Sequence, residues 1–213
     1  MATLSLARAY QLSFDARPHS TLAVTGGCLN ALGDFVAQVS SNVVCLGREE
    51  HEKRQPYDYV RTMRFFAFGV MISPMMGRWN TFLEHRFPLR STLASGGKGK
   101  VSFKALSKRV AADQLMMAPV GLGLFLGSMG MMEGRSRRQI SEKFRDLYPT
   151  AILANWKVWP AAQFVNFRFM PLPYRVPFSQ TCGVFWTLYL SILNAKEDDK
   201  QDTRTAMRRT IDS

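Results

Sequence analysis

The sequence predicts an all-α protein, a multi-pass transmembrane helical bundle of about four spans with one ambiguous element near its C-terminal end. Three observations support this fold class. Apolar stretches of about 20 residues, the length that crosses a bilayer core of roughly 30 Å, alternate with blocks of charge. These blocks keep the mean hydropathy of the 213 residues at -0.10, so the average hides the spans. Tryptophan and tyrosine stand near a span end, as in the aromatic belts of membrane proteins.

Two stretches are the clearest spans. In residues 110–132 the strongly polar side chains, Asp113 and Gln114, lie in the first turn, and the rest is too long and too uniformly apolar for the core helix of a soluble domain. Residues 176–194 carry no charge and hold Trp186 and Tyr189 near one end. Both stretches are therefore predicted to cross the membrane.

The remaining apolar stretches are less uniform. Residues 21–46 and 62–82 are predicted spans, and Pro74 and Pro119 predict kinks, because neighbouring groups in a membrane bundle can satisfy the backbone carbonyl that a proline frees. Residues 151–170 contain charge and proline, so a full span, a re-entrant element and an interfacial helix all stay open.

The chain is thus predicted to form one membrane-embedded domain over residues 1–195, followed by a charged, disordered tail over residues 196–213. We expect an amphipathic lead-in helix at the N-terminus and not a cleavable secretory signal, because this segment lacks the apolar stretch of such a signal. The predicted spans lie near 21–46, 62–82, 110–132 and 151–194.

The net charge of +12 has a membrane explanation. Residues 86–109 carry seven basic residues and no acid, and residues 133–148 are also basic, with Ile140, Phe144 and Leu147 at the spacing of a short amphipathic surface helix. Basic loops of this kind contact anionic lipid. The aromatic residues lie in the spans and not among the basic residues, so the lipid bilayer is the predicted partner and nucleic acid is not.

The sequence predicts neither a metal site nor a cofactor. It contains no CxxC and no HExxH among its cysteines and histidines, which are Cys28, Cys45, Cys182, His19, His51 and His85. No nucleophile and base pair or phosphate-binding loop is present either, so the chain is not expected to be an enzyme. The cysteines are either small packing residues or a redox-sensitive pair.

Polar residues inside the spans are the candidate functional residues. Gly26, Asn30, Asp34 and Gln38 recur every fourth residue and form one ridge of a helix. An ionised Asp34 facing lipid costs several kcal/mol, so this ridge must face protein or water. The full candidate set for the interior, with Arg78 as the expected partner of a carboxylate, is Asp34, Gln38, Arg78, Asp113, Gln114, Gln163 and Asn166. These residues either fix helix packing through hydrogen bonds or line a hydrophilic path.

A second ridge consists of small residues. Gly123, Gly127, Gly130 and Gly134 lie on one side of the third predicted span, and Gly123 with Gly127 makes a GxxxG pattern. Such a pattern favours close helix packing, either within the chain or between two copies. A homo-oligomer is therefore a possible assembly.

The C-terminal part contains a long motif with Asn155, Trp156, Trp159, Pro160, Gln163, Asn166, Phe167, Pro171, Arg175, Trp186 and Tyr189. This motif resembles the C-terminal signature of the Mpv17 / PMP22 family of small membrane proteins. Earlier segments agree in order, namely those with Asp34 and Gln38, with Pro74 and Trp79, and with Asp113, Gln114 and Pro119. Asn80 departs from the family pattern, in which an aromatic residue commonly follows the tryptophan.

The resemblance implies a four-span bundle in the mitochondrial inner membrane, with the peroxisomal membrane as the alternative. It also implies a channel or transporter that passes small metabolites with weak selectivity and supports mitochondrial homeostasis and stress responses. The solute is unknown. The competing interpretation is a membrane organiser or scaffold that transports nothing and binds partner proteins.

Overall fold

The computed structural model describes residues 2–44, 56–89 and 101–188, and the regular structure in these ranges is helical. The elements are α1 (Ala2–Ala16), α2 (Pro18–Val44), α3 (Tyr59–Arg86), α4 (Phe103–Ala112), the π-helical turn η2 (Asp113–Met117), α5 (Ala118–Met132), α6 (Arg137–Phe169) and a final helix over residues 172–188. The all-α prediction is confirmed for this part of the chain. Tyr189, Cys45, His51 and the predicted tail lie outside it.

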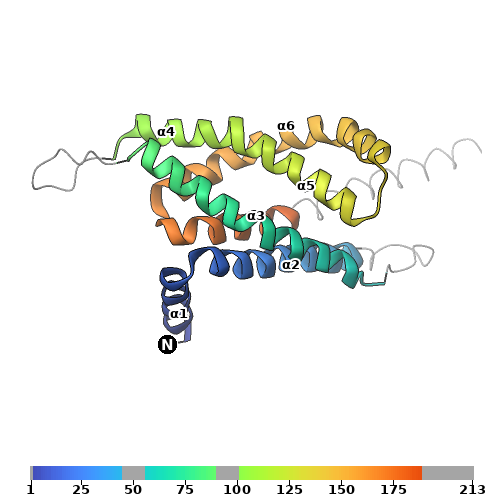
Figure 1. Cartoon of the computed structure of the whole chain (residues 1–213), viewed down its shortest axis with the longest axis horizontal. Coiled ribbons are helices and arrows are strands. Elements are labelled where there is room, and N and C mark those ends of the chain that lie inside the picture. Colours follow the sequence, from blue (N-terminus) through green and yellow to red (C-terminus); the bar gives the residue numbers. More distant parts are fainter. Residues whose placement is uncertain (1, 45–55, 90–100, 189–213) are drawn as a thin grey trace, which may run out of the picture.

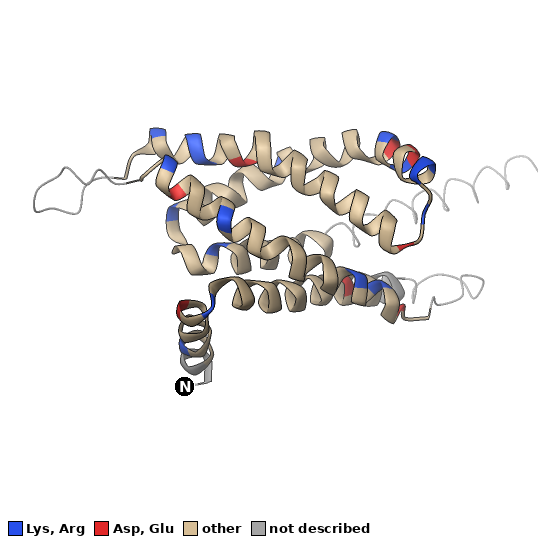
Figure 2. Ribbon diagram, viewed as in Figure 1, with Lys and Arg blue, Asp and Glu red and all other residues tan. Residues whose placement is uncertain are grey.

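Apart from α1, the helices run back and forth roughly along one long axis (Figure 1). α2 packs along α3, and α4, η2 and α5 form one rod that α6 follows in the opposite direction. The final helix lies between these two groups. In Figure 2 most coloured segments gather at the two ends of the bundle, and the middle is largely uncharged. This distribution suits helices that cross an apolar layer.

α1 forms the predicted lead-in helix and projects from one end of the bundle (Figure 1). It is fixed to the start of the final helix, because the Tyr10 hydroxyl donates a 2.7 Å hydrogen bond to the Pro173 carbonyl. The Tyr10 and Tyr174 rings lie 5.2 Å apart between centroids. Burial, with the nearby Tyr174, raises the pKa of Tyr10 to about 12, so this hydroxyl stays a donor at neutral pH.

Polar caps set where the later helices begin. The Asp58 carboxylate accepts the Arg61 amide hydrogen at 2.8 Å and starts α3. Ser136 and Gln139 form a reciprocal capping box at the start of α6. Between α5 and α6 the backbone of Gly134 has a φ of 71°, which a residue without a Cβ adopts at low cost.

Two rods are long and apolar enough to span a membrane by length and composition. They are Pro18–Ser40, with a hydropathy of 1.2, and Phe103–Met132, with a hydropathy of 1.6. In α3 and α6 charged residues interrupt the apolar stretches. The structure thus supports two of the spans, and the four-span arrangement stays a prediction.

The rod from Phe103 to Met132 contains the disturbance expected near Pro119. In η2 the Ala118 amide donates to the Asp113 carbonyl five residues back, which is the π-helical register. The next donor in that register would reach the Gln114 carbonyl, but Pro119 has no amide hydrogen. The indole Nε1 of Trp156 donates to that carbonyl instead, at 2.9 Å.

The prediction for α6 was wrong in its boundaries. We expected a short surface helix within residues 133–148 and a separate element over 151–170, whereas the structure has one helix with Pro149 and Pro160 inside it. A proline removes one backbone hydrogen bond and bends a helix, but contacts with neighbouring helices can carry the helix through. α6 packs against α4, η2 and α5, and these contacts favour a continuous helix.

Glycines let α2 and α3 approach at backbone distance. A Cβ added to Gly69 would lie 2.4 Å from the Gly26 carbonyl oxygen, and one added to Gly77 would lie 2.4 Å from Leu22 Cδ1. Only part of the glycine ridge of α5 lies in close contact with another helix. A Cβ on Gly130 would lie 2.7 Å from Ile140 of α6, whereas one on Gly127 would meet no atom of the described residues within 4 Å.

The α2–α3 contact predicts a clear difference between two glycine variants. Gly69→Ala should destabilise the protein by about 1–3 kcal/mol, because the new methyl group meets a backbone oxygen that cannot rotate away. Gly127→Ala should change stability by less than about 1 kcal/mol, since its methyl group enters open space. Thermal unfolding of the purified full chain in detergent measures both. Equal effects of the two substitutions would contradict the close helix contact.

Candidate functional site

A first polar cluster joins α2 to the start of α3. The buried Asp34 carboxylate accepts hydrogen bonds from the Gln38 amide and the Thr62 hydroxyl, both at 2.7 Å through Oδ2. Gln38 Oε1 in turn accepts the Asp58 amide hydrogen at 2.8 Å, and Tyr57 shares a 2.7 Å hydrogen bond with Thr62. The predicted ridge of α2 therefore faces protein.

The cation beside Asp34 is Arg61. Its Nε lies 2.7 Å from Asp34 Oδ1, and its side chain reaches the surface, whereas that of Asp34 is fully buried. The N–H does not point at this oxygen closely enough for a hydrogen bond, so the contact is an ion pair. Arg78, which the sequence suggested as the interior cation, is exposed on α3. That expectation was wrong, because Arg78 lies five residues after the buried Ser73, about 140° around the helix.

A second polar cluster surrounds Asp113 in η2. Trp79 Nε1 of α3 donates to Asp113 Oδ1 at 3.0 Å, while Gln163 Nε2 of α6 and Gln114 Nε2 both donate to Oδ2 at 2.9 Å. Within the described residues Asp113 has no contact with a positively charged group. Three neutral donors, from α3, from α6 and from η2 itself, hold this carboxylate.

The second cluster continues into the final helix. Asn166 Nδ2 donates to Gln163 Oε1 at 2.8 Å, to Ser179 Oγ at 2.9 Å and to the Arg175 carbonyl at 3.2 Å. The buried Arg175 side chain reaches back to α3, where it pairs with Glu84 at 2.8 Å. The turn at residues 170–171 thus brings α6 and the final helix together around Asn166.

A second buried cation, Arg109, lies at the C-terminal end of α3. Arg109 of α4 donates from Nε to the Phe87 carbonyl at 2.7 Å and from a terminal nitrogen to the Glu84 carbonyl at 3.4 Å. Carbonyls at the C-terminus of a helix lack helical partners and carry partial negative charge, so a guanidinium there is favourable. Arg109 lies beside the apolar core formed by Leu83, Leu106 and Phe167.

These contacts follow α3 from end to end. Its polar partners come in order, with Thr62 bound to Asp34, Ser73 to Gln180, Trp79 to Asp113, and Glu84 to Arg175. We call these four contacts the polar line. Thr62 and Glu84 are separated by about 33 Å of helix at 1.5 Å per residue. This length is close to the thickness of a bilayer core, so a crossing by α3, as the sequence predicts, would place these polar contacts at several depths.

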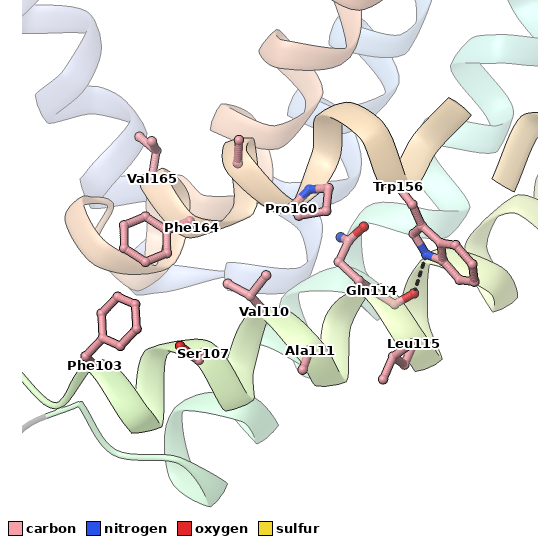
Figure 3. A pocket seen from close by; sticks show the side chains of 11 residues that line it. Phe103, Ser107, Val110, Ala111, Gln114, Leu115, Trp156, Pro160, Phe164 and Val165 are labelled. Carbon is pink, nitrogen blue, oxygen red and sulfur yellow. Dashed lines mark hydrogen bonds between the residues drawn. The ribbon is translucent and has the colours of Figure 1, made fainter. Parts of the chain in front are cut away.

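An apolar pocket lies apart from the polar line, between α4, η2 and α6 (Figure 3). Its volume is about 760 Å³, and its walls include Phe103, Val110, Leu115 and Phe164. Trp156 stands at one end of it, where its indole hydrogen bond to the Gln114 carbonyl is visible. Such a pocket offers mainly apolar contacts, with Ser107 and Gln114 as polar residues in its lining.

Comparison with known proteins gives a consistent result. Residues 130–191 match the model of the Mpv17 / PMP22 family. "Protein SYM1" of Eremothecium gossypii is 34% identical over 187 residues, which cover 87% of this chain and 94% of that protein. "Mitochondrial inner membrane protein Mpv17" of Rattus norvegicus is 33% identical over 189 residues, covering 88% and 97%. The chain belongs to the Mpv17 / PMP22 family. No solved structure matches it.

Membership of the Mpv17 / PMP22 family confirms that this is a membrane protein. The similarity to the rat protein supports the predicted location in the mitochondrial inner membrane. A protein of Dictyostelium discoideum called "PXMP2/4 family protein 4" is also similar, with 31% identity over 194 residues. The peroxisomal alternative stays a prediction.

The residues of the family motif have different structural positions. Pro74 lies inside α3, Pro119 follows η2, and Pro171 stands at the break between α6 and the final helix. Trp159 packs over Gly183 of the final helix, at 3.9 Å from an added Cβ. The other members with described positions are Trp79 and Arg175 on the polar line, Phe167 in the apolar core, Asn155 and Pro160 in α6, and Trp186 in the final helix.

Sequence reasoning missed part of the two clusters and most of the buried face of α3. Thr62, Gly69, Ser73 and Asn80 fall within about 40° of one another around α3 at 100° per residue, and this periodicity could have shown that face. Arg61 was overlooked because it lies one residue before the predicted span. No local pattern marks the pairing of Glu84 with Arg175, which are 91 residues apart.

The ion pair predicts unequal effects for two arginines of α3. Arg61→Gln should destabilise the protein by about 1–3 kcal/mol, because Asp34 stays buried without its cation. Arg78→Gln should change stability by less than about 0.5 kcal/mol, since Arg78 is exposed. Thermal unfolding of the full chain in detergent compares them. A larger loss for Arg78→Gln would restore the original expectation.

Proposed function

We propose that the chain is a weakly selective channel or transporter for small metabolites in the mitochondrial inner membrane, and that the polar line along α3 is its path. A path needs polar groups at successive depths of the bundle, and α3 provides them near both ends and between. The solute-facing residues are then Asp34, Gln38, Asp113, Gln114, Gln163 and Asn166, the interior set expected from the sequence without Arg78.

Unpaired buried oxygens are the observation that carries this proposal. The side-chain oxygens of Gln114, Asn166 and Gln180 are buried without a hydrogen-bond partner among the described residues. The amide groups of Gln114 and Asn166 cannot simply be reversed, because their nitrogens donate to oxygens. A dry, unpaired buried oxygen costs about 1–3 kcal/mol. Access of water to these atoms removes that cost, and a hydrophilic path supplies the water.

We propose that side chains close this path in the structure. Asp113 is held by α3 and α6 together, and Phe65 and Phe68 of α3 contact the Phe125 ring of α5 at 5.7 and 5.2 Å between centroids. Aromatic constrictions of this kind close pores by excluding water. We therefore assign the structure to a closed state, which opens when the contacts of Asp113 separate.

The charges along the path favour weak selectivity. Asp34 is paired with Arg61 and Glu84 with Arg175, so these carboxylates add little net charge. Among the carboxylates of the polar line, Asp113 is the one without a cation contact in the described part of the chain, and it should give a modest preference for cations.

Planar-bilayer recordings of the purified full chain test the proposal. We expect conductance from the wild-type protein, a reduced preference for cations in Asp113→Asn, and a changed conductance in Asp34→Asn. Asp146→Asn removes an exposed acid of α6 away from the polar line and should behave as wild type. Each variant is first shown to be folded by its thermal unfolding transition.

Two results would overturn the channel. One is the absence of conductance from folded wild-type protein, and the other is identical conductance and selectivity in Asp34→Asn, Asp113→Asn and wild type. Either result would favour the alternative, a membrane organiser that binds partner proteins. The many interhelical hydrogen bonds of Asp113 and Asn166 also suit a purely structural role. A homo-oligomer, the lack of a cofactor and the lack of enzymatic activity stay predictions.

A further inference from the structure

A groove between the end of α5 and the start of α6 combines an apolar floor with a cationic rim. Its volume is about 560 Å³, within the roughly 300–1,000 Å³ of small-molecule sites. Gly127 and Met131 of α5 and Ile140 and Phe144 of α6 line the apolar part. Gly127 leaves it open, because an added Cβ there meets no described atom within 4 Å.

The rim carries two arginines and a hydroxyl on one side of α6. Arg137, Ser141 and Arg145 are spaced four residues apart, so they follow one another along one face of the helix, and all three line the groove. Arg137 makes no ion pair in the described part of the chain. The contact of Arg145 Nε with Oδ1 of the exposed Asp146 is long, at 4.0 Å, and therefore weak. Both guanidinium groups can therefore bind an external anion.

The other acids nearby are already engaged. Arg138 pairs with Glu142 at 3.0 Å, and Glu133 pairs with Arg135 and with Lys143. Burial alone would raise the pKa of Glu133. The hydrogen bonds and positive charges of Arg135 and Lys143 outweigh this effect, so the pKa of Glu133 lies below its usual value. Glu133 thus stays ionised with these partners, and Arg137 keeps its charge available.

The position of the groove identifies the anion. The apolar rod that can span a membrane ends at Met132, so Gly127 and Met131 lie at the inner edge of the headgroup layer and the arginines lie within that layer. Juxtamembrane arginines attract anionic lipid headgroups, and apolar floors at this depth contact acyl chains. A free phosphate could bind the arginines of the rim, but it has no apolar group that could contact the floor of the groove.

We propose that this groove binds one anionic phospholipid, with its phosphate between Arg137, Ser141 and Arg145 and an acyl chain over Gly127. The site is independent of the proposed path, since none of its residues belongs to the polar line. It would anchor the α5–α6 end of the bundle to one leaflet.

Native mass spectrometry and thermal unfolding of the full chain in detergent test this site with phosphatidylglycerol as the probe. Wild-type protein should bind phosphatidylglycerol more tightly than phosphatidylcholine and should unfold at a higher temperature in its presence. A juxtamembrane arginine contributes about 1 kcal/mol, so Arg137→Gln or Arg145→Gln should weaken binding about fivefold. Arg138→Gln, an exposed neighbour outside the groove, should bind as wild type.

The floor is tested by a matched pair of glycine variants. Gly127→Leu should fill the groove and abolish the stabilisation by phosphatidylglycerol, whereas Gly121→Leu, also in open space on α5 but outside the groove, should keep it. The transition without lipid shows whether each variant is folded, and native mass spectrometry counts the bound lipid independently of stability.

Several results would overturn the proposal. Equal binding of phosphatidylglycerol by wild type, Arg137→Gln and Gly127→Leu would exclude the groove as the site. Equal binding of phosphatidylcholine would remove the role of the arginines. Stabilisation by inorganic phosphate alone would identify a free anion as the ligand. A dimer that dissociates in Gly127→Leu would show that a second copy of the chain occupies the groove.

Discussion

The need to satisfy the buried Asp113 carboxylate governs the arrangement of this bundle. A carboxylate in an apolar interior is costly unless it is neutralised or fully hydrogen-bonded. Asp113 has no contact with a cation among the described residues, and it accepts hydrogen bonds from Trp79, Gln163 and Gln114. Because these donors lie on α3, α6 and η2, the positions of three elements depend on one side chain.

The same constraint explains the irregular turn of the third rod. The π-helical register at Asp113–Met117 inserts one extra residue into a turn, which is common at functional sites. It places Asp113 and Gln114 together in the interior. Because Pro119 has no amide hydrogen, the Gln114 carbonyl accepts the indole hydrogen of Trp156 instead. Two tryptophans from different helices thus donate to adjacent residues of η2. The π-helical turn η2 loses regular α-helical hydrogen bonds and gains side-chain hydrogen bonds with α3 and α6.

The two carboxylates of the interior are held in different ways. Asp34 lies near one end of α3 and has a cation, Arg61, which reaches the surface. Asp113 lies deeper along α3, beside Trp79, and has neutral donors only. A transported ion or polar molecule could replace neutral donors more readily than it could separate an ion pair in a low-dielectric interior. In the channel that we propose, this difference makes Asp113 the residue on which opening depends.

Much of the fold and part of the site followed from the sequence. Periodicity placed Asp34 with Gln38, and the burial of Asp113, Gln114 and Asn166, with Gln163 partly buried beside them, was expected because polar residues in apolar spans must face inward. The partners were not foreseen, since the pairing of Arg175 with Glu84 depends on how helices far apart in sequence pack. Arg78 was misplaced because its charge was considered without its angle around α3. The continuity of α6 was missed because the basic, amphipathic residues 133–148 and the more apolar residues 151–170 were considered as separate elements.

Hydrogen exchange of the Trp79 indole N–H, followed by NMR in the full-length protein in detergent, tests the central role of Asp113 most directly. We expect slow exchange in the wild-type protein and much faster exchange in Asp113→Leu, which introduces an apolar side chain of similar shape and removes the acceptor. Trp156 should respond in the same direction if η2 rearranges. Wild-type exchange at Trp79 as fast as in free tryptophan would contradict the account.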